Sequence, residues 1–254
     1  MKFYILGKKQ IVRITSVVLA LAAVFTVTVF AANGGKRLPI YCVETEKKEI
    51  AISFDAAWGC DDTKTLIDIL AQYNVPATFF IVGQWVERYP EAVKMLSDAG
   101  HSIQNHSSTH PKMSGISAEA QAKEITDCNE KIKQITGVCP TLFRAPYGDY
   151  NNTLIETVED LGMYTIQWDV DSLDWKDSAT PQSIADRVIS KTKNGSIILC
   201  HNDAEHTPEA LPTILKTLQE QGYTFVPLSE LIYKKDYTIE HDGTQVYEGK
   251  TDGN

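Results

Sequence analysis

No two of the five cysteines are spaced as CxxC, and their number is odd. The sequence therefore shows neither the ligand spacing of a zinc ribbon nor a complete disulfide framework. It also lacks a G-x-S-x-G nucleophile elbow, since Ser107 and Ser108 lie between two histidines without one. These absences disfavour a small disulfide-stabilised domain and a serine acyl hydrolase.

Basic charge is scarce beyond the first 32 residues. That segment holds four basic residues and no acidic one, whereas the remainder has 20 basic and 33 acidic residues. Nucleic-acid phosphates require a basic face, and this balance supplies none. We therefore expect no nucleic-acid partner, and recognition of any wall polymer must depend on local contacts.

Charged residues are also missing from Ile14 to Ala32, a run of nineteen residues rich in Val, Ala and Leu. This length just crosses a bilayer, and Lys8, Lys9 and Arg13 would stay on its cytoplasmic side. The run is either a membrane anchor or a cleaved signal peptide. The anchor is favoured, because Val29 and Phe30 make a poor signal-peptidase site. Both alternatives predict an extracytoplasmic protein, anchored in the cell membrane or exported.

The rest of the chain alternates short apolar runs with longer helical patterns. We predict residues 1–32 as the anchor or signal segment, 33–48 as a linker, 49–233 as the functional domain and 234–254 as a polar tail. Helices are expected over 63–72, 90–99, 118–137, 152–161, 181–193 and 208–221, and strands over 50–54, 77–82, 102–105, 141–143, 164–168, 196–200 and 223–226. Such alternation predicts an α/β fold, a distorted (β/α) barrel of about seven strands.

Reactive residues follow these predicted strands, at the face where a barrel assembles its active site. His106 and His110 are spaced to share a metal ion, provided that their loop turns helically. Asp55, paired with Arg144, is a candidate general base, and His201 is a candidate general acid if a carboxylate such as Asp171 orients it. Taken singly, each also fits a structural role, as loop histidines, a turn carboxylate or a buried core histidine.

Five ordered motifs make the pattern more specific: SFD (53–55), HSSTH (106–110), RAPYG (144–148), DSLDW (171–175) and IILCH (197–201). In order and spacing they closely resemble the motifs of the NodB-type polysaccharide deacetylases, carbohydrate esterase family 4. The resemblance covers roughly residues 48–230. The FDAAWG stretch and the single N-terminal apolar segment look like the PdaB type of spore-forming bacteria.

The resemblance implies roles position by position. Asp55 matches the catalytic base, Arg144 the residue that holds it, and His201 the general acid with Asp171 as its partner. His106 and His110 match the metal-binding pair. The positions that match substrate contacts are Tyr147, whose backbone N–H would stabilise the oxyanion, Asp174, Trp175 as an aromatic wall, and Leu199 beside the acetyl methyl.

One position departs from the family pattern: Ala56 stands where most members have a second Asp as the third metal ligand. An alanine supplies no lone pair. Either the metal, Zn²⁺ or Co²⁺, is held by two histidines and water, or Asp61 or Asp62 reaches back from the following loop. Loss of a ligand would weaken metal binding and catalysis.

Two functions remain open from the sequence. The first is metal-dependent hydrolysis of N-acetyl groups from amino sugars of a cell-wall polysaccharide, peptidoglycan or chitin-like, linked to spore formation. The second is a wall or sporulation protein that binds carbohydrate through Tyr147 and Trp175 but has lost turnover through Ala56. A monomer is expected in either case, with the membrane as a further partner through the N-terminal segment.

Overall fold

The computed structural model describes residues 35–249, so the predicted membrane segment over 1–32 lies outside the described residues. Within 35–249, no helix combines the length and apolarity needed to cross a bilayer. The elements below belong to one unit that begins at Leu38.

The main sheet runs in the order β6-β5-β4-β3-β2-β8-β7, and a further strand, β9, pairs with β2. All of these pairings are parallel. Their bounds are β2 (Glu49–Ala56), β3 (Thr78–Ile81), β4 (Ser102–Asn105), β5 (Leu142–Phe143), β6 (Tyr164–Thr165), β7 (Val170–Asp171), β8 (Ile197–His201) and β9 (Thr224–Phe225). The half-barrel fits the predicted distorted (β/α) barrel of about seven strands, although β7 was not predicted.

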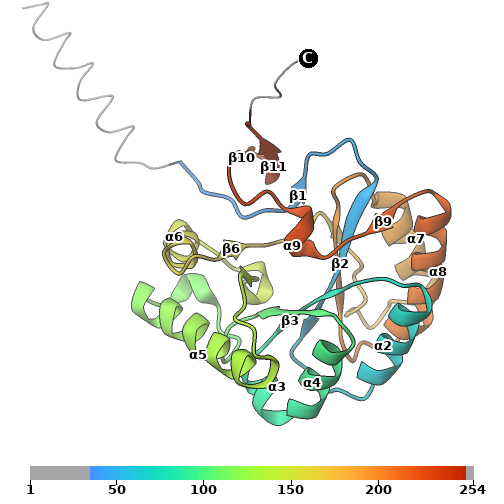
Figure 1. Cartoon of the computed structure of the whole chain (residues 1–254), viewed down its shortest axis with the longest axis horizontal. Helices are drawn as coiled ribbons and strands as arrows, with labels where there is room; N and C mark the ends of the chain where they lie inside the picture. The colour runs from blue at the N-terminus through green and yellow to red at the C-terminus, as the bar shows by residue number, and fades with distance from the viewer. Residues whose placement is uncertain (1–34, 250–254) are drawn as a thin grey trace, which may run out of the picture. The chain divides into compact units, whose positions relative to one another are not determined.

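Helices lie around the outside of these strands (Figure 1). They are α2 (Thr63–Gln72), α3 (Gly83–Arg88), α4 (Pro90–Asp98), α5 (Ala118–Thr136), α6 (Asn152–Asp160), α7 (Pro181–Lys191), α8 (Thr207–Glu220) and α9 (Leu228–Leu231), with short 3₁₀ turns at Met113–Gly115 and Pro146–Gly148. Each of the six predicted helices is present, with ends that differ by at most two residues. Their ends follow local chemistry: the Ser117 hydroxyl accepts from the Ala120 N–H, and Gly137 ends α5 in the left-handed conformation.

Both ends of the domain differ from the predicted linker and tail. β1 (Cys42–Val43) lies in the predicted linker, while β10 (Tyr237–Ile239) and β11 (Thr244–Tyr247) lie in the predicted tail, and these three strands form a second sheet. Ile40 and Val43 are buried. These strands have two to four residues, and the only buried residue in β10 and β11 is Gln245, so no apolar alternation marks them in the sequence.

The segment that leads into β1 also bridges two strands of the main sheet. The Ile40 N–H donates to the Thr165 carbonyl at 2.9 Å, and the Val43 N–H donates to the Gly195 carbonyl at 3.0 Å. Thr165 belongs to β6, at one end of the strand order, and Gly195 lies two residues before β8, the strand beside β7 at the other end. Residues 40–43 therefore link the two sides of the half-barrel that its own strands do not join.

Candidate active site

The carboxyl ends of the strands meet at a cavity of about 650 Å³. Asp55 at the end of β2 and His201 at the end of β8 are direct register partners, so their side chains lie at the same level of adjacent strands. Eight of the predicted site residues line this cavity: Asp55, His106, His110, Tyr147, Asp171, Trp175, Leu199 and His201. Motifs up to about 150 residues apart in the chain thus converge at one face, as parallel strands require.

Asp55 forms a buried ion pair with Arg144. The Nη1 of Arg144 donates to Oδ1 of Asp55 at 2.7 Å, while its Nη2 donates to the Ser53 hydroxyl and to the Gln167 carbonyl. The Arg144 side chain is fully buried and Asp55 is 7% exposed. Burial alone would raise the pKa of Asp55, but the charge of Arg144, followed by that of His106, lowers it below the usual range. Asp55 is therefore held as a carboxylate.

His106 and His110 converge through a loop that is not helical. Ser107 and His110 both have left-handed backbone, with φ of 67° and 63°, so the helical turn assumed from their spacing is wrong. The Ser107 N–H donates to the Asn105 side chain and the His110 N–H donates to the Ser107 hydroxyl. The two rings meet edge to face with centroids 5.0 Å apart. Side-chain hydrogen bonds thus maintain a strained loop that brings both imidazoles together.

The protonation of the two imidazoles suits a metal ion. His106 Nδ1 lies 2.8 Å from the Arg144 carbonyl oxygen, which can only accept, so Nδ1 carries the hydrogen and Nε2 keeps its lone pair. That Nε2 faces Asp55, with Oδ2 at 3.6 Å. Burial lowers the pKa of His106, and burial followed by the charge of His106 lowers the pKa of His110 to about 4. Both rings are therefore neutral at pH 7, the form in which an imidazole can bind a metal ion.

A third ligand from the following loop, however, is not provided. Asp61 and Asp62 do not line the cavity, and Asp62 Oδ2 instead accepts the backbone N–H of Asp203 at 2.8 Å. The side chain of Ala56 is buried in the apolar core beneath the helices. Over residues 35–249, no three His, Cys, Asp or Glu side chains are grouped to hold a metal ion. For a divalent ion, the described residues therefore offer the two imidazoles as donors, with the Asp55 carboxylate nearby.

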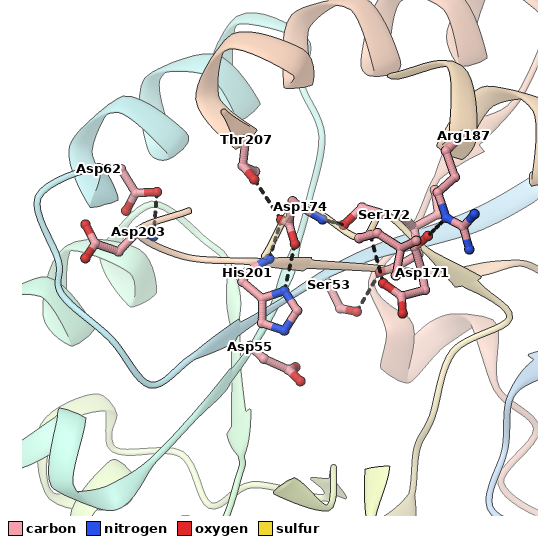
Figure 2. A network of polar contacts seen from close by, with 12 residues as sticks. Ser53, Asp55, Asp62, Asp171, Ser172, Asp174, Arg187, His201, Asp203 and Thr207 are labelled. Carbon is pink, nitrogen blue, oxygen red and sulfur yellow. Dashed lines mark hydrogen bonds and ion pairs between the residues drawn. The ribbon is translucent and has the colours of Figure 1, made fainter. Parts of the chain in front are cut away.

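The carboxylate partner of His201 is Asp174, not Asp171 as predicted. His201 Nδ1 lies 2.7 Å from Asp174 Oδ1, and the His201 backbone N–H donates to Oδ2 of the same carboxylate (Figure 2). The Thr207 hydroxyl also donates to that Oδ2. Asp171 is turned to accept the backbone N–H of Leu173, and its carbonyl accepts from Arg187. The left-handed backbone of Leu173 makes the reversal that places Asp174 behind His201.

Asp174 also fixes the charge state of His201. Burial alone would lower the pKa of this imidazole, but the hydrogen bond and charge of Asp174, followed by the charges of Asp55 and Asp171, raise it above 6.5. With Nδ1–H bonded to Asp174, the Nε2 side of the ring is left for the cavity. The two cavity-facing groups Asp55 and His201 therefore have pKa values displaced in opposite directions, a pattern typical of a base and an acid.

Replacing Asp174 by Asn should lower the pKa of His201 more than replacing Asp171 by Asn. Protonated His201 favours the folded state, so its contribution to the free energy of unfolding is fully present below about pH 6.5, the ordinary histidine value. That contribution is lost as the pH rises through the raised folded-state pKa. The Asp174→Asn defect in stability should therefore be largest below that window and shrink above it. NMR titration of the histidine ring protons and urea unfolding at several pH values measure both effects; equal pKa changes in the two variants would contradict the assignment.

Aromatic and apolar side chains form the rest of the wall. Tyr147 is 67% exposed, has left-handed backbone with φ of 60°, and packs its ring on the edge of His110. Trp175 is 50% exposed, whereas Leu199 is almost fully buried at the cavity surface. The cavity thus combines an exposed aromatic rim with a small apolar surface near Asp55 and His201.

Sequence reasoning missed several residues that build the site. Glu124, in the middle of α5, accepts the backbone N–H groups of Ser108 and Thr109 and so holds the histidine loop. Trp58 lines the cavity and stacks on His201. Trp58 could have been noticed because it lies two residues after the strand that carries Asp55. Nothing in the sequence, however, distinguishes Glu124 from other helical glutamates.

Comparisons with known proteins agree with this geometry. The family model described as polysaccharide deacetylase matches residues 43–166. The chain is 37% identical over 198 residues to a peptidoglycan-N-acetylglucosamine deacetylase of Bacillus cereus, covering 76% of this chain and 92% of that protein. It is also 34% identical over 194 residues to the uncharacterized protein YlxY of Bacillus subtilis. That match covers 76% of this chain and 60% of the length of YlxY.

Solved structures give the same fold. A carbohydrate esterase family 4 pseudoenzyme from Bacillus anthracis superposes with a TM-score of 0.74 and 34% identity, over 78% of this chain and 69% of that chain. A mutant of that pseudoenzyme is described as having restored enzymatic activity. The matched domain, the identity over most of a full-length relative and the converging motifs show that this chain belongs to the polysaccharide deacetylase family, carbohydrate esterase family 4.

Proposed function

We propose that this protein hydrolyses N-acetyl groups from amino sugars of a cell-wall polysaccharide, with peptidoglycan as the substrate. The observation that carries the proposal is the pair formed by Asp55 and His201. These residues are register partners at the ends of adjacent strands, face one cavity, and have pKa values displaced in opposite directions. The cell-wall substrate rests on the Bacillus cereus relative, whose name states that it acts on peptidoglycan N-acetylglucosamine.

The reaction divides between these two groups. A water oxygen attacks the acetamide carbonyl carbon while the Asp55 carboxylate accepts a proton from the water. The C–N bond then breaks, and protonated His201 donates its Nε2 proton to the departing nitrogen. The products are acetate and a free amino sugar. Arg144 keeps Asp55 ionised and oriented, and Asp174 keeps His201 protonated and oriented.

His106 Nε2 and the His110 imidazole are the groups that would hold a divalent ion, Zn²⁺ or Co²⁺. When bound, such an ion polarises the acetamide carbonyl and makes the attacking water more acidic. This assistance matters because a carboxylate with a lowered pKa, as Asp55 has, is a weak base by itself. Tyr147 and its backbone N–H, placed at the cavity rim beside His110, would stabilise the negative oxygen that develops on the carbonyl.

The charges of the cavity favour an uncharged acetamido sugar. Within the described chain, the residues that line the cavity include the carboxylates of Asp55 and Asp171 but no lysine or arginine. The guanidinium of Arg144 is fully buried behind Asp55 and cannot reach a substrate carboxylate. Trp175, Tyr147 and Leu199 instead offer surfaces for the apolar face of a sugar ring and for the acetyl methyl.

A second candidate is a protein that binds the same polysaccharide without turnover. It is favoured by Ala56, which leaves two imidazoles as the metal ligands, and by the likeness to the Bacillus anthracis pseudoenzyme. Stacking of sugar rings on Trp175 and Tyr147 requires no metal. Binding would then persist after the ion is removed.

One experiment separates the two functions. The purified full chain with added Zn²⁺ or Co²⁺ should release acetate from N-acetylglucosamine oligomers or peptidoglycan, and a chelator should reduce the rate by about 10-fold or more. Calorimetric binding of the same oligomer is measured in parallel. Binding that persists in chelator, without acetate release under any metal, would support the second candidate, and absence of both binding and release would contradict both.

The remaining expectations concern the protein's place in the cell. We propose that it works outside the cytoplasm, where its polysaccharide lies, as a monomer held to the membrane by its N-terminal segment. The link to spore formation rests on the resemblance of FDAAWG to the PdaB type and stays a prediction.

A further inference from the structure

Trp58 lies over one face of the His201 ring. The indole and imidazole centroids are 5.3 Å apart with an angle of 17° between the planes, which is a parallel stack. Trp58 is 46% exposed and lines the cavity, in the loop between β2 and α2. His201 is thus held at its Nδ1 edge by Asp174 and covered on one face by an aromatic ring from a different loop.

The backbone beside Trp58 is fastened to the loop that follows His201. The Gly59 N–H donates to Asp203 Oδ2 at 3.0 Å, and the Gly59 carbonyl accepts from the side chains of Trp85, at 2.9 Å, and Asn202. A Cβ at position 59 would lie 2.3 Å from Asp203 Oδ2, so glycine is needed for this approach. Asp203 in turn donates its backbone N–H to Asp62 (Figure 2). The stack is therefore set by hydrogen bonds on both loops and not by chance contact of two exposed rings.

The stack has two physical effects on His201. The π face of an indole attracts a cation, so it favours the protonated imidazole. A ring pressed against another ring also cannot rotate freely, so its Nε2 edge stays directed into the cavity. Three carboxylates act on His201 and favour its protonation: Asp174, Asp55 and Asp171. The charge of His201 in turn lowers the pKa of His106 and of His110.

We propose that Trp58 is a positioning residue for His201: it covers one face of the imidazole and keeps the Nε2 edge aimed at the leaving nitrogen of the substrate. The role is distinct from that of Trp175, which lies on the wall of the cavity and has no ring contact with His201. The proposal rests on the proposed deacetylation for its catalytic meaning, but the contact with His201 can be tested without turnover.

The test compares Trp58→Leu, Trp58→Phe and Trp175→Leu in the full chain. Trp58→Leu should lower kcat by about 3- to 10-fold with little change in KM, because an imidazole that can rotate freely is less often aimed at the leaving nitrogen. It should also lower the pKa of His201 in an NMR titration and move the His201 limb of the pH–rate profile to lower pH. Trp58→Phe should keep most of the wild-type kcat and most of the raised pKa of His201. Trp175→Leu should raise KM and leave the pKa of His201 unchanged.

The titration distinguishes this inference from the proposed function. If the wild-type chain releases no acetate, a lowered pKa of His201 in Trp58→Leu still supports the positioning role. An unchanged pKa, or a change in KM alone, would overturn the proposal and leave Trp58 as a sugar-stacking surface. A pKa lowered as much in Trp58→Phe as in Trp58→Leu would also overturn it, because the aromatic face would then have no part.

Discussion

Replacing Asp55 by Asn is expected to reduce acetate release by about 100-fold or more, the usual contribution of a positioned general base. Asparagine keeps the shape of the side chain but cannot accept a proton at neutral pH. The rate is to be measured on a soluble N-acetylglucosamine oligomer with saturating Zn²⁺ or Co²⁺. Asp61→Asn is the matched control, because Asp61 is an exposed carboxylate on the next loop and does not line the cavity.

The Asp55→Asn variant will also be less stable, and the assay must separate the two effects. Loss of the carboxylate leaves the buried Arg144 guanidinium without its charge partner. Rates should therefore be compared at a temperature well below the unfolding midpoint of the variant, with circular dichroism to verify that it is folded. A folded Asp55→Asn protein that releases acetate at the wild-type rate would exclude Asp55 as the base.

The largest expected loss of stability follows from Arg144→Met. Arg144 is the largest fully buried side chain, and its removal leaves the 7% exposed carboxylate of Asp55 without compensation. Breaking a buried ion pair in this way typically costs about 3–5 kcal/mol. For a domain of this size the unfolding midpoint should fall by about 6–20 °C. Urea unfolding monitored by tryptophan fluorescence measures the change in free energy.

Two further variants show whether the loss comes from the ion pair. The double variant Asp55→Asn with Arg144→Met should be less destabilised than the sum of the single variants, because neither buried charge then remains alone. Lys94→Met removes an exposed i,i+4 pair with Asp98 and should leave the free energy of unfolding nearly unchanged. Strict additivity of the two buried replacements would show that Arg144 stabilises the fold by packing, through its contacts with Phe80 and Trp168, and not through Asp55.

The Asp55–Arg144 ion pair affects both catalysis and stability. The carboxylate that the proposed reaction needs is kept charged inside the protein by the Arg144 guanidinium, which has no access to solvent. Arg144 lowers the pKa of Asp55, and the fold in turn depends on the ion pair between the two residues for its stability. Ala56, by contrast, adds an apolar side chain to the core immediately after this carboxylate.

Local sequence patterns were sufficient to predict most of the helices and strands and the face on which the candidate site lies. Alternation of apolar strands with amphipathic helices depends on local periodicity, so β2, β4 and the six longer helices could be located within a few residues. Reactive residues directly after strands had to converge, because the carboxyl ends of parallel strands share one edge. Asp55, His106, His110 and His201 were identified in this way.

The contacts between these side chains, by contrast, could be read only from the folded structure. Asp171 and Asp174 are three residues apart with the same chemistry, and the left-handed turn at Leu173 selects Asp174 as the partner of His201. The hydrogen bond that Asp62 accepts from Asp203, the stack of Trp58 on His201 and the support of the histidine loop by Glu124 likewise depend on loops that pack against distant segments. Periodicity carries no information about such contacts, because a loop's path is set by hydrogen bonds to residues far away in the chain.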